Sequence, residues 1–188
     1  QPVMAVCGDS TFFHAVLPAL VNAVHNQSDM ILVVLDNSGT AMTGFQPHPG
    51  SPAGATGIKL PMLDIEKLCC AIDIRVEVSD PFDLQGTREI LLDLLEDSGN
   101  PRVLILKQPC ALSPIKKGNK MYEMSIGVDL CLADLCGCNK LCTRVFKCPG
   151  LIWDTLKGKV QIDEVLCAGC GVCANVCPTG AINAERVR

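Results

Sequence analysis

The sequence predicts an α/β domain with a parallel sheet, followed by a small cysteine-rich α+β domain. As far as Lys107, short apolar runs rich in Val, Ile and Leu alternate with segments of helical periodicity. This alternation is typical of a parallel sheet covered by helices. From Met121 onward the composition changes, and nine of the thirteen cysteines fall between Cys131 and Cys177. We therefore expect two domains, 1–118 and 119–188.

The composition limits the classes of function. With 188 residues, 48% of them hydrophobic, the chain is long and apolar enough to bury a core. Its net charge of −4 argues against nucleic acid as a partner. The apolar runs are too short to span a bilayer, and none resembles a signal peptide. With so many clustered cysteines and no export signal, we expect a reducing cytoplasm and no membrane partner.

The first strand of the predicted sheet begins almost at once. Val3–Cys7 is apolar, and Gly8-Asp9-Ser10 follows as a turn at its carboxyl end. Because an apolar strand lies so close to Gln1, we expect the sheet to be incomplete at this side and the chain to be the C-terminal piece of a longer polypeptide. A helix is expected over Thr11–Asn26, with Pro18 either kinking it or starting a new helix.

The second strand brings polar residues to the same edge of the sheet. Met30–Leu35 is a buried run that ends in Asp36-Asn37-Ser38-Gly39. A helical crossover places the carboxyl ends of neighbouring parallel strands side by side, so Asp9 and Asn37 should meet. Both offer the oxygen ligands that Mg²⁺ prefers, and Gly39 could add its carbonyl. Ordinary turn chemistry explains the same residue types equally well.

A long loop dense in Gly and Pro covers Thr40–Gly57. Long ordered loops in compact domains are usually functional, although a flexible linker is the alternative. His48 lies between two prolines of this loop. It is a candidate acid–base group, although a plain hydrogen-bonding role is more common for such a residue.

The remaining elements of the first domain continue the alternation. The pattern predicts helices over Leu63–Ala71 and Leu84–Glu96, the second capped by Asp83, strands over Ile74–Val78 and Val103–Lys107, and a linker over Pro109–Asn119. Four cysteines in this domain lack the spacing of metal ligands and are expected to be small buried residues: Cys7, Cys69, Cys70 and Cys110.

The C-terminal cysteines follow the iron–sulfur spacing C-x2-C-x2-C-x3-C-P. Its members are Cys167, Cys170, Cys173 and Cys177. In ferredoxins with two clusters the fourth cysteine of such a run ligates the other cluster, so one run predicts a second. Zinc sites usually pair two CxxC units or add histidines, and no histidine follows His48. We therefore expect two [4Fe–4S] clusters and an electron-transfer function.

The other half of the cysteine-rich domain is irregular. A short strand over Met121–Val128 precedes five cysteines for four places: Cys131, Cys136, Cys138, Cys142 and Cys148. Cys148-Pro-Gly-Leu-Ile echoes Cys177-Pro-Thr-Gly-Ala-Ile, so Cys148 should join the first three cysteines of the C-terminal run. Cys177 then joins Cys138, Cys142 and either Cys131 or Cys136, which spacing alone leaves open. A cluster with fewer irons, or a labile one, is the alternative for this half.

The irregular half of the cysteine-rich domain also carries basic residues. Lys140, Arg144 and Lys147 lie among its cysteines, and Lys116, Lys117 and Lys120 precede them. Positive surface near a cluster steers acidic electron carriers such as ferredoxin. A merely solvated face is an equally good interpretation.

A site for a metal and a diphosphate beside two clusters suggests thiamine diphosphate, which stabilises carbanions. Two stretches resemble the thiamine-diphosphate segment of the indolepyruvate:ferredoxin oxidoreductases, alpha (large) subunit. They are Gly8-Asp9-Ser10-Thr-Phe-Phe-His14 and Leu35-Asp36-Asn37-Ser-Gly-Thr-Ala-Met-Thr-Gly-Phe-Gln-Pro-His-Pro-Gly50. The Cys138…Cys148-Pro and Cys167…Cys177-Pro groups resemble the C-terminal ferredoxin domain of that subunit.

The resemblance implies oxidative decarboxylation of an aryl-2-oxo acid such as indolepyruvate, with coenzyme A taking the acyl group and two electrons passing through the clusters to ferredoxin. It implies thiamine diphosphate, Mg²⁺ and two [4Fe–4S] clusters as cofactors. It also implies two protein partners, the N-terminal remainder of the alpha subunit and a smaller beta subunit.

Residue roles follow from the same resemblance. Gly8, Asp9 and Ser10 lie at the cofactor, and Asp9, Asn37 and Gly39 bind magnesium. Thr43, Gly44 and Gln46 lie near the thiazolium, and Met42 forms a pocket wall. Gln46 and His48 are the candidate catalytic residues. Ser10 and Asp36 depart from the usual diphosphate pattern in a way that the family shares.

Two rival functions remain open at this point. Pyruvate, branched-chain oxo acids or phenylglyoxylate could be the substrate instead, although the Met42–Gly50 segment argues against pyruvate. The chain could also be a non-catalytic electron-transfer subunit, which the Asp9 and Asn37 pair argues against.

Overall fold

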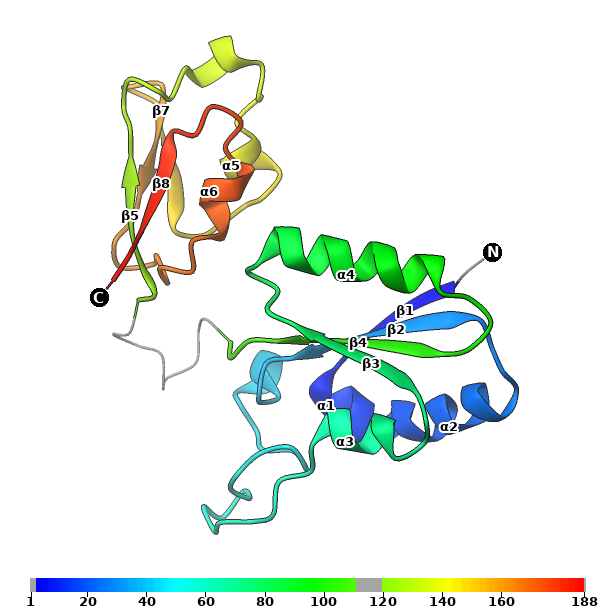
Figure 1. Cartoon of the computed structure of the whole chain (residues 1–188). Coiled ribbons are helices and arrows are strands. Elements are labelled where there is room, and N and C mark those ends of the chain that lie inside the picture. The colour runs from blue at the N-terminus through cyan, green and yellow to red at the C-terminus, as the bar shows by residue number, and fades with distance from the viewer. Residues whose placement is uncertain (1–2, 111–119, 188) are drawn as a thin grey trace. The chain divides into compact units, whose positions relative to one another are not determined.

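The computed structural model describes residues 3–110 and 120–187 (Figure 1). The chain divides into two compact units, Gln1–Ser113 and Pro114–Arg188. The predicted domain boundary and most of the predicted linker fall within 111–119, outside the described residues. Each unit is described by itself below.

The first unit is built on a four-stranded parallel sheet, as the sequence predicts. The strand order is β1-β2-β4-β3, where β1 is Val3–Gly8, β2 is Met30–Asp36, β4 is Arg102–Lys107 and β3 is Arg75–Ser79. The register pairs Gly8 with Leu35, and Asp36 with Lys107. The residues that follow β1 and β2 therefore begin at the same edge of the sheet.

Helices cover both faces of this sheet (Figure 1). One face carries α4, Leu84–Glu96, and the other carries α1, Asp9–Thr11, α2, Leu17–His25, and α3, Ile65–Cys70. The caps of α3 and α4 are aspartates, since the carboxylate of Asp64 accepts the N–H of Lys67 and that of Asp83 accepts the N–H of Gly86. Asp83 thus caps the helix for which the sequence predicts it.

The turn predicted after β1 is absent, because the chain enters a helix directly at Asp9. A π-helical segment, Phe12–Val16, joins α1 to α2. Pro18 lies in the first turn of α2, directly after the π-helical segment, where it offers no N–H to the preceding turn. The predicted helix is thus continuous, and Pro18 marks the start of its second regular part.

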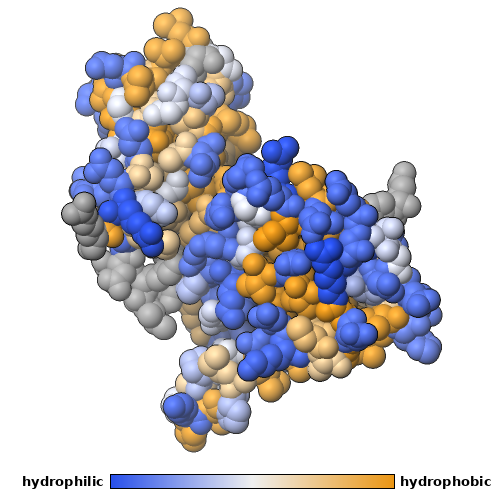
Figure 2. All heavy atoms as spheres, viewed as in Figure 1, coloured by the Kyte–Doolittle hydropathy of each residue, from blue (hydrophilic) through white to orange (hydrophobic). Residues whose placement is uncertain are grey.

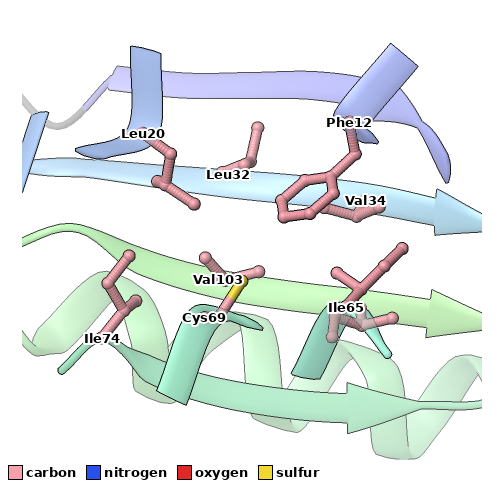
Figure 3. Packing of buried hydrophobic residues seen from close by; sticks show 9 residues of the cluster. Phe12, Leu20, Leu32, Val34, Ile65, Cys69, Ile74 and Val103 are labelled. Atoms are coloured by element: carbon pink, nitrogen blue, oxygen red, sulfur yellow. The ribbon is translucent and has the colours of Figure 1, made fainter. Parts of the chain in front are cut away.

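Two apolar layers hold the sheet to its helices, whereas hydrophilic and hydrophobic residues are mixed on the surface shown in Figure 2. On the α1–α3 face, Phe12 and Cys69 pack over β2 and β4 beside Leu32 and Val103 (Figure 3). Burial, followed by the nearby thiols of Cys70 and Cys7, raises the pKa of Cys69 to about 12, so this thiol stays protonated. Cys70, expected to be buried, is exposed, because its neighbour in α3 takes the inward position.

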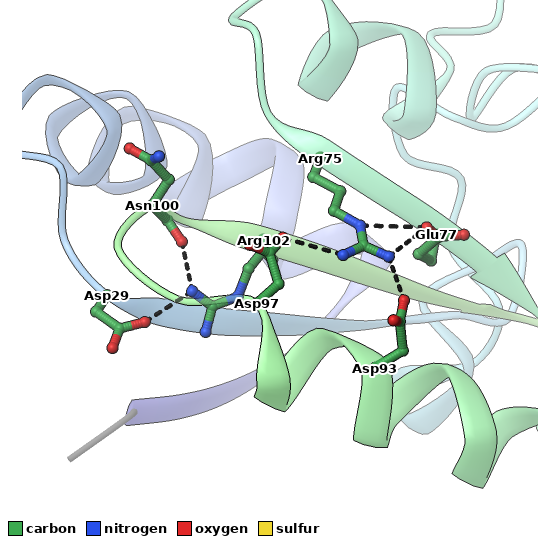
Figure 4. Close-up of polar contacts among 7 residues, drawn as sticks. All are labelled: Asp29, Arg75, Glu77, Asp93, Asp97, Asn100 and Arg102. Atoms are coloured by element: carbon green, nitrogen blue, oxygen red, sulfur yellow. Dashed lines mark hydrogen bonds and ion pairs between the residues drawn. The ribbon is translucent and has the colours of Figure 1, made fainter.

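An arginine is fully buried at the amino edge of the sheet. The Nη1 group of Arg102, a residue only 1% exposed, donates to the Oδ1 atom of Asp29 at 2.7 Å and to the carbonyl of Asn100 at 2.7 Å (Figure 4). Its Nε and Nη2 atoms have no partner within the described part of the chain. On the surface nearby, Arg75 pairs with Glu77, Asp93 and Asp97.

We expect Asp29→Asn to lower the thermal midpoint of unfolding markedly, because it leaves the buried guanidinium of Arg102 without a counter-charge. Arg102→Met removes the buried charge and leaves unpaired only the carboxylate of Asp29, whose side chain is 40% exposed, so it should cost much less. Asp97→Asn, at the exposed pair with Arg75, should have little effect. Calorimetry of the three variants checks this order, and an unchanged midpoint in Asp29→Asn would contradict it.

The second unit consists of two antiparallel strand pairs and short helical segments. Strand β5, Tyr122–Ile126, pairs with β8, Ile182–Arg186, and β6, Leu151–Asp154, pairs with β7, Lys159–Ile162. The helical segments are η4, Ala133–Cys136, α5, Leu141–Arg144, and α6, Val172–Val176. This α+β arrangement agrees with the prediction. No helix in residues 3–110 or 120–187 is long and apolar enough to cross a membrane.

Candidate functional site

The strand ends of β1 and β2 bring a buried carboxylate and an amide together. Asp9, only 3% exposed, accepts the N–H of Ser10 on Oδ1 at 2.8 Å. Its Oδ2 atom accepts the N–H of Gly39 at 3.2 Å, and the same N–H lies 3.2 Å from Oδ1 of Asn37. The sequence-predicted magnesium residues Asp9, Asn37 and Gly39 therefore form one cluster.

His48 belongs to this cluster as well. Its Nδ1 atom accepts the N–H of Gly50 at 3.0 Å, so the ring proton is on Nε2, which donates to Oδ2 of Asp9 at 3.1 Å. The ring also stacks on Phe13, with centroids 5.5 Å apart. His48 thus contacts a proposed metal ligand rather than an open surface.

A second carboxylate lies at the same strand ends. Asp36 accepts the N–H of Ser38 at 3.1 Å, and the Nζ atom of Lys107 is 3.8 Å from its Oδ2 atom. Burial raises the pKa of Asp36, and the nearby charge of Asp9 raises it further against the opposing effects of Ser38 and Lys107. Among the described residues, the two carboxylates are accompanied by one lysine, Lys107, which lies beside Asp36.

These residues fit a divalent cation. A buried carboxylate is costly unless a cation compensates it, yet the described donors to Asp9 are two backbone N–H groups and a neutral imidazole. The donor set of carboxylate, amide and main-chain oxygens is also the set that Mg²⁺ prefers. Asp9, Asn37 and Gly39 would hold the ion.

The residues predicted near the thiazolium lie in a separate turn of the same loop. Thr43 donates its hydroxyl to Oε1 of Gln46 at 2.5 Å, and the side-chain amide of Gln46 donates back to the carbonyl of Thr43 at 2.6 Å. Gly44 adopts the left-handed conformation at φ 116°, and Met42 is 99% exposed. The described contacts do not join Met42, Thr43, Gly44 or Gln46 to the Asp9 cluster.

In the second unit, four cysteines gather around one end of α6. Burial raises the pKa of Cys173 to about 12, with further contributions from the nearby Cys148, Cys170 and Cys167. Burial likewise raises the pKa of Cys148, and Cys170 and Cys167 add to it. Cys148, from the irregular half, therefore lies with the first three cysteines of the C-terminal run, as the repeat predicts.

The other cysteines surround a small apolar pocket. Its lining includes Cys131, Cys138, Cys142 and Cys177, with the aliphatic parts of Leu141 and Lys140. Burial raises the pKa of Cys142, and Cys138 and Cys177 contribute to the rise. The structure thus brings Cys131 to this group, while the side chain of Cys136 lies outside what is described.

No three His, Cys, Asp or Glu side chains of the described residues lie close enough together to bind one metal ion.

Glycines shape the loop between Cys167 and Cys173. Gly169 and Gly171 adopt positive φ, and a Cβ atom on them would lie 2.6 Å from the carbonyl oxygen of Tyr122 and 2.9 Å from its ring. A Cβ on Gly150 would lie 2.9 Å from Cα of Cys167. The loop can fold against Tyr122 only with glycine at these positions.

The sequence pattern does not identify several residues of the first site. Phe13 and Ser51 surround His48, and Lys107 faces Asp36. The pairing of Lys107 with Asp36 follows from the strand register, which requires the strand order. Phe13 carried no signal beyond an aromatic residue in a predicted helix.

Residues 1–105 match the family described as "Thiamine pyrophosphate enzyme, C-terminal TPP binding domain", and residues 160–183 match the "4Fe-4S binding domain". The chain is also 42% identical over 187 residues to the indolepyruvate oxidoreductase subunit IorA of Methanothermobacter thermautotrophicus, covering 98% of this chain and 28% of that protein. The IorA subunit of Pyrococcus horikoshii is 40% identical over 191 residues, covering 99% and 28%.

The chain thus spans little more than a quarter of the length of these relatives. Among solved structures, it is similar to a thiamine diphosphate-dependent 4-hydroxybenzoylformate decarboxylase of Rhodococcus jostii RHA1, with a TM-score of 0.43 and 15% identity over 58% of this chain and 20% of that one.

Proposed function

The chain belongs to the thiamine pyrophosphate enzyme family through its C-terminal cofactor-binding domain, and from this premise we propose that it is part of a 2-oxo-acid:ferredoxin oxidoreductase. The preferred substrate class is aryl-2-oxo acids such as indolepyruvate. One observation carries the proposal. The chain combines a buried carboxylate at parallel strand ends, whose described donors are all neutral, with two groups of four neighbouring cysteines.

The proposed reaction consumes one 2-oxo acid and one coenzyme A thiol. The bond between the carboxylate and the keto carbon breaks, CO2 and one proton leave, and the acyl group forms a thioester with coenzyme A. The two electrons released reduce two molecules of a one-electron acceptor such as ferredoxin. When bound, thiamine diphosphate supplies the stabilisation of negative charge on the former keto carbon.

We assign the binding of thiamine diphosphate and magnesium to the first unit. Asp9, Asn37 and Gly39 would hold the magnesium, and Gly8 and Ser10 would lie beside the bound cofactor. Thr43, Gly44 and Gln46 would lie near the thiazolium, with Gln46 as the candidate catalytic side chain and Met42 as a wall of the substrate pocket.

In the second unit we propose two [4Fe–4S] clusters. One is ligated by Cys148, Cys167, Cys170 and Cys173, and the other by Cys131, Cys138, Cys142 and Cys177. The remainder of the alpha subunit and a beta subunit complete the enzyme in a reducing cytoplasm.

A substrate panel tests this function. The anaerobic complex is mixed with coenzyme A and with indolepyruvate, phenylglyoxylate, a branched-chain oxo acid or pyruvate, and the bleaching of the cluster absorbance near the visible maximum is followed. We expect the fastest bleaching with indolepyruvate. Equal or faster bleaching with pyruvate would refute the aryl preference, and bleaching with none of the four would favour a non-catalytic electron-transfer subunit.

The cluster of Cys131, Cys138, Cys142 and Cys177 is bordered by positive charge. The ammonium of Lys140 lies 4.5 Å from the ring centroid of Trp153. Arg144 is exposed at the end of α5, and its guanidinium donates a hydrogen bond to Oδ1 of Asn139. The segment before the other cluster carries Asp163 and Glu164, and the ammonium of Lys120 donates to the carbonyl of Glu164, so positive and negative charges offset one another there. An acidic electron carrier should therefore approach the cluster of Cys131, Cys138, Cys142 and Cys177.

We expect the double variant Lys140→Glu and Arg144→Glu to slow reduction of an acidic ferredoxin by about tenfold or more at low ionic strength, because steering raises association rates by roughly 10–10³-fold. The difference should shrink as salt screens the charges. Stopped-flow kinetics across a salt series measures it, with Lys157→Glu in the β6–β7 turn as the control. Kinetics unchanged at low salt would contradict the steering.

A further inference from the structure

We propose that His48 is a positioning residue, which holds the metal-binding carboxylate of Asp9 and fastens the loop between β2 and α3 to the strand ends. The inference rests on the proposed function, because it assigns Asp9 to the magnesium. It differs from an acid–base role for His48, which the sequence alone suggests.

Both ring nitrogens of His48 are engaged within the chain. Nδ1 accepts the N–H of Gly50, and Nε2 donates to Asp9. Neither nitrogen is left to exchange a proton with a substrate. His48 is 7% exposed and Asp9 is 3% exposed, so their hydrogen bond is shielded from water and correspondingly strong.

The surroundings fix the ring in this orientation. It stacks on Phe13 with an interplanar angle of 28°. The backbone N–H of His48 donates to the hydroxyl of the buried Ser51 at 3.0 Å, and the N–H of Ser51 donates to the carbonyl of His48 at 2.8 Å. A Cβ on Gly50 would lie 2.9 Å from the ring of Phe13 and 3.0 Å from that of His48, so glycine is required there.

This arrangement connects two parts of the proposed cofactor site. His48 belongs to the same loop as Thr43 and Gln46, which are proposed to face the thiazolium. Its bond to Asp9 therefore ties the position of that loop to the carboxylate that holds the metal. Ligating carboxylates are commonly oriented by such outer hydrogen bonds, and removing one typically costs about 10–100-fold in metal affinity.

Two substitutions of His48 separate its two hydrogen bonds. His48→Gln keeps an N–H donor at the distance of Nε2, within reach of Asp9. His48→Asn keeps a polar atom near Nδ1 for Gly50 but does not reach Asp9. His25→Asn is the matched control, because His25 is an exposed histidine at the end of α2.

The measurement is Mn²⁺ binding to the anaerobic, oxidised whole complex with saturating thiamine diphosphate, read from the electron paramagnetic resonance of free Mn²⁺. We expect His48→Asn to weaken binding about 10–100-fold, while His48→Gln and His25→Asn stay close to the wild type. A second readout is trypsin cleavage after the exposed Lys59 of the loop, which should become faster in His48→Asn only.

The outcomes distinguish this inference from the proposed function. If the wild type binds Mn²⁺ and His48→Asn binds equally well, or if His48→Gln loses as much as His48→Asn, the positioning role is overturned while the function stands. If the wild type binds neither Mn²⁺ nor thiamine diphosphate, both are overturned. Should His48→Asn not assemble, Gly50→Ala, which crowds the same ring, is expected to weaken Mn²⁺ binding likewise.

Discussion

Replacing Asp9 with asparagine is expected to abolish substrate-driven reduction of the clusters while leaving the clusters themselves in place. The substitution keeps the shape of the side chain but removes the buried charge that a magnesium ion would balance. An amide also turns an N–H group toward the donors that now face the carboxylate, the N–H of Gly39 and Nε2 of His48. We expect a loss of metal affinity beyond the roughly 10–100-fold typical for an outer-shell partner.

The expected result has three measurable parts. In Asp9→Asn, thiamine diphosphate and magnesium should be missing from the purified complex, iron should be unchanged, and dithionite should still reduce the clusters. Asp83→Asn is the matched control, because Asp83 caps α4 through the N–H of Gly86 and asparagine caps a helix as well. An Asp9→Asn complex that retains magnesium and still reduces its clusters with a 2-oxo acid would contradict the assignment.

Replacing Cys177 with serine is expected to remove the cluster of the irregular half, and not the cluster of the three cysteines that precede it in the sequence. The Sγ atom of Cys177 faces the pocket shared with Cys131, Cys138 and Cys142. Burial raises its pKa, but hydrogen bonds from Thr179 and from the backbone N–H groups of Thr179, Ala181 and Ile182 outweigh this and lower it. A thiolate stabilised in this way suits an iron ligand.

Serine variants at four positions give a test with two expected spectra. Cys177→Ser and Cys131→Ser should each lose about half of the iron and leave the same reduced signal in electron paramagnetic resonance. Cys148→Ser and Cys173→Ser should also lose about half and leave the other signal. If Cys177→Ser shares its signal with Cys173→Ser, cross-ligation is wrong.

Cys136→Ser serves as the comparison for the fifth cysteine. We expect it to keep both clusters, since Cys131 already lines the pocket with the other three thiols. Loss of the same signal as in Cys177→Ser, with Cys131→Ser intact, would reverse that assignment.

The elements of the first unit follow from apolar periodicity. The helix predicted over Leu84–Glu96 has those bounds in the structure. Strands β1, β2 and β4 differ from their predicted bounds by one residue at one end, and β3 differs by one residue at each end. The turn after β1 was predicted wrongly, because Gly8-Asp9-Ser10 has the composition of a turn while Asp9 also suits the first turn of a helix, where its charge meets the positive end of the dipole.

The sites were predictable where spacing or topology determines them. Parallel strand ends bring Asp9 to Asn37, and the repeated Cys-Pro places Cys148 with the C-terminal run. The contact of His48 with Asp9 was not predictable, because it depends on how the loop folds over Phe13. Spacing also does not distinguish Cys131 from Cys136, whereas the packing of the pocket includes Cys131.

The most direct test of the account is the cofactor content of the whole complex, purified without oxygen. We expect about one thiamine diphosphate, one magnesium and eight iron atoms in the two clusters for each copy of this chain. The clusters should become reduced on addition of indolepyruvate and coenzyme A. A complex that carries the full iron but no thiamine diphosphate or magnesium, and whose clusters stay oxidised with these substrates, would contradict it.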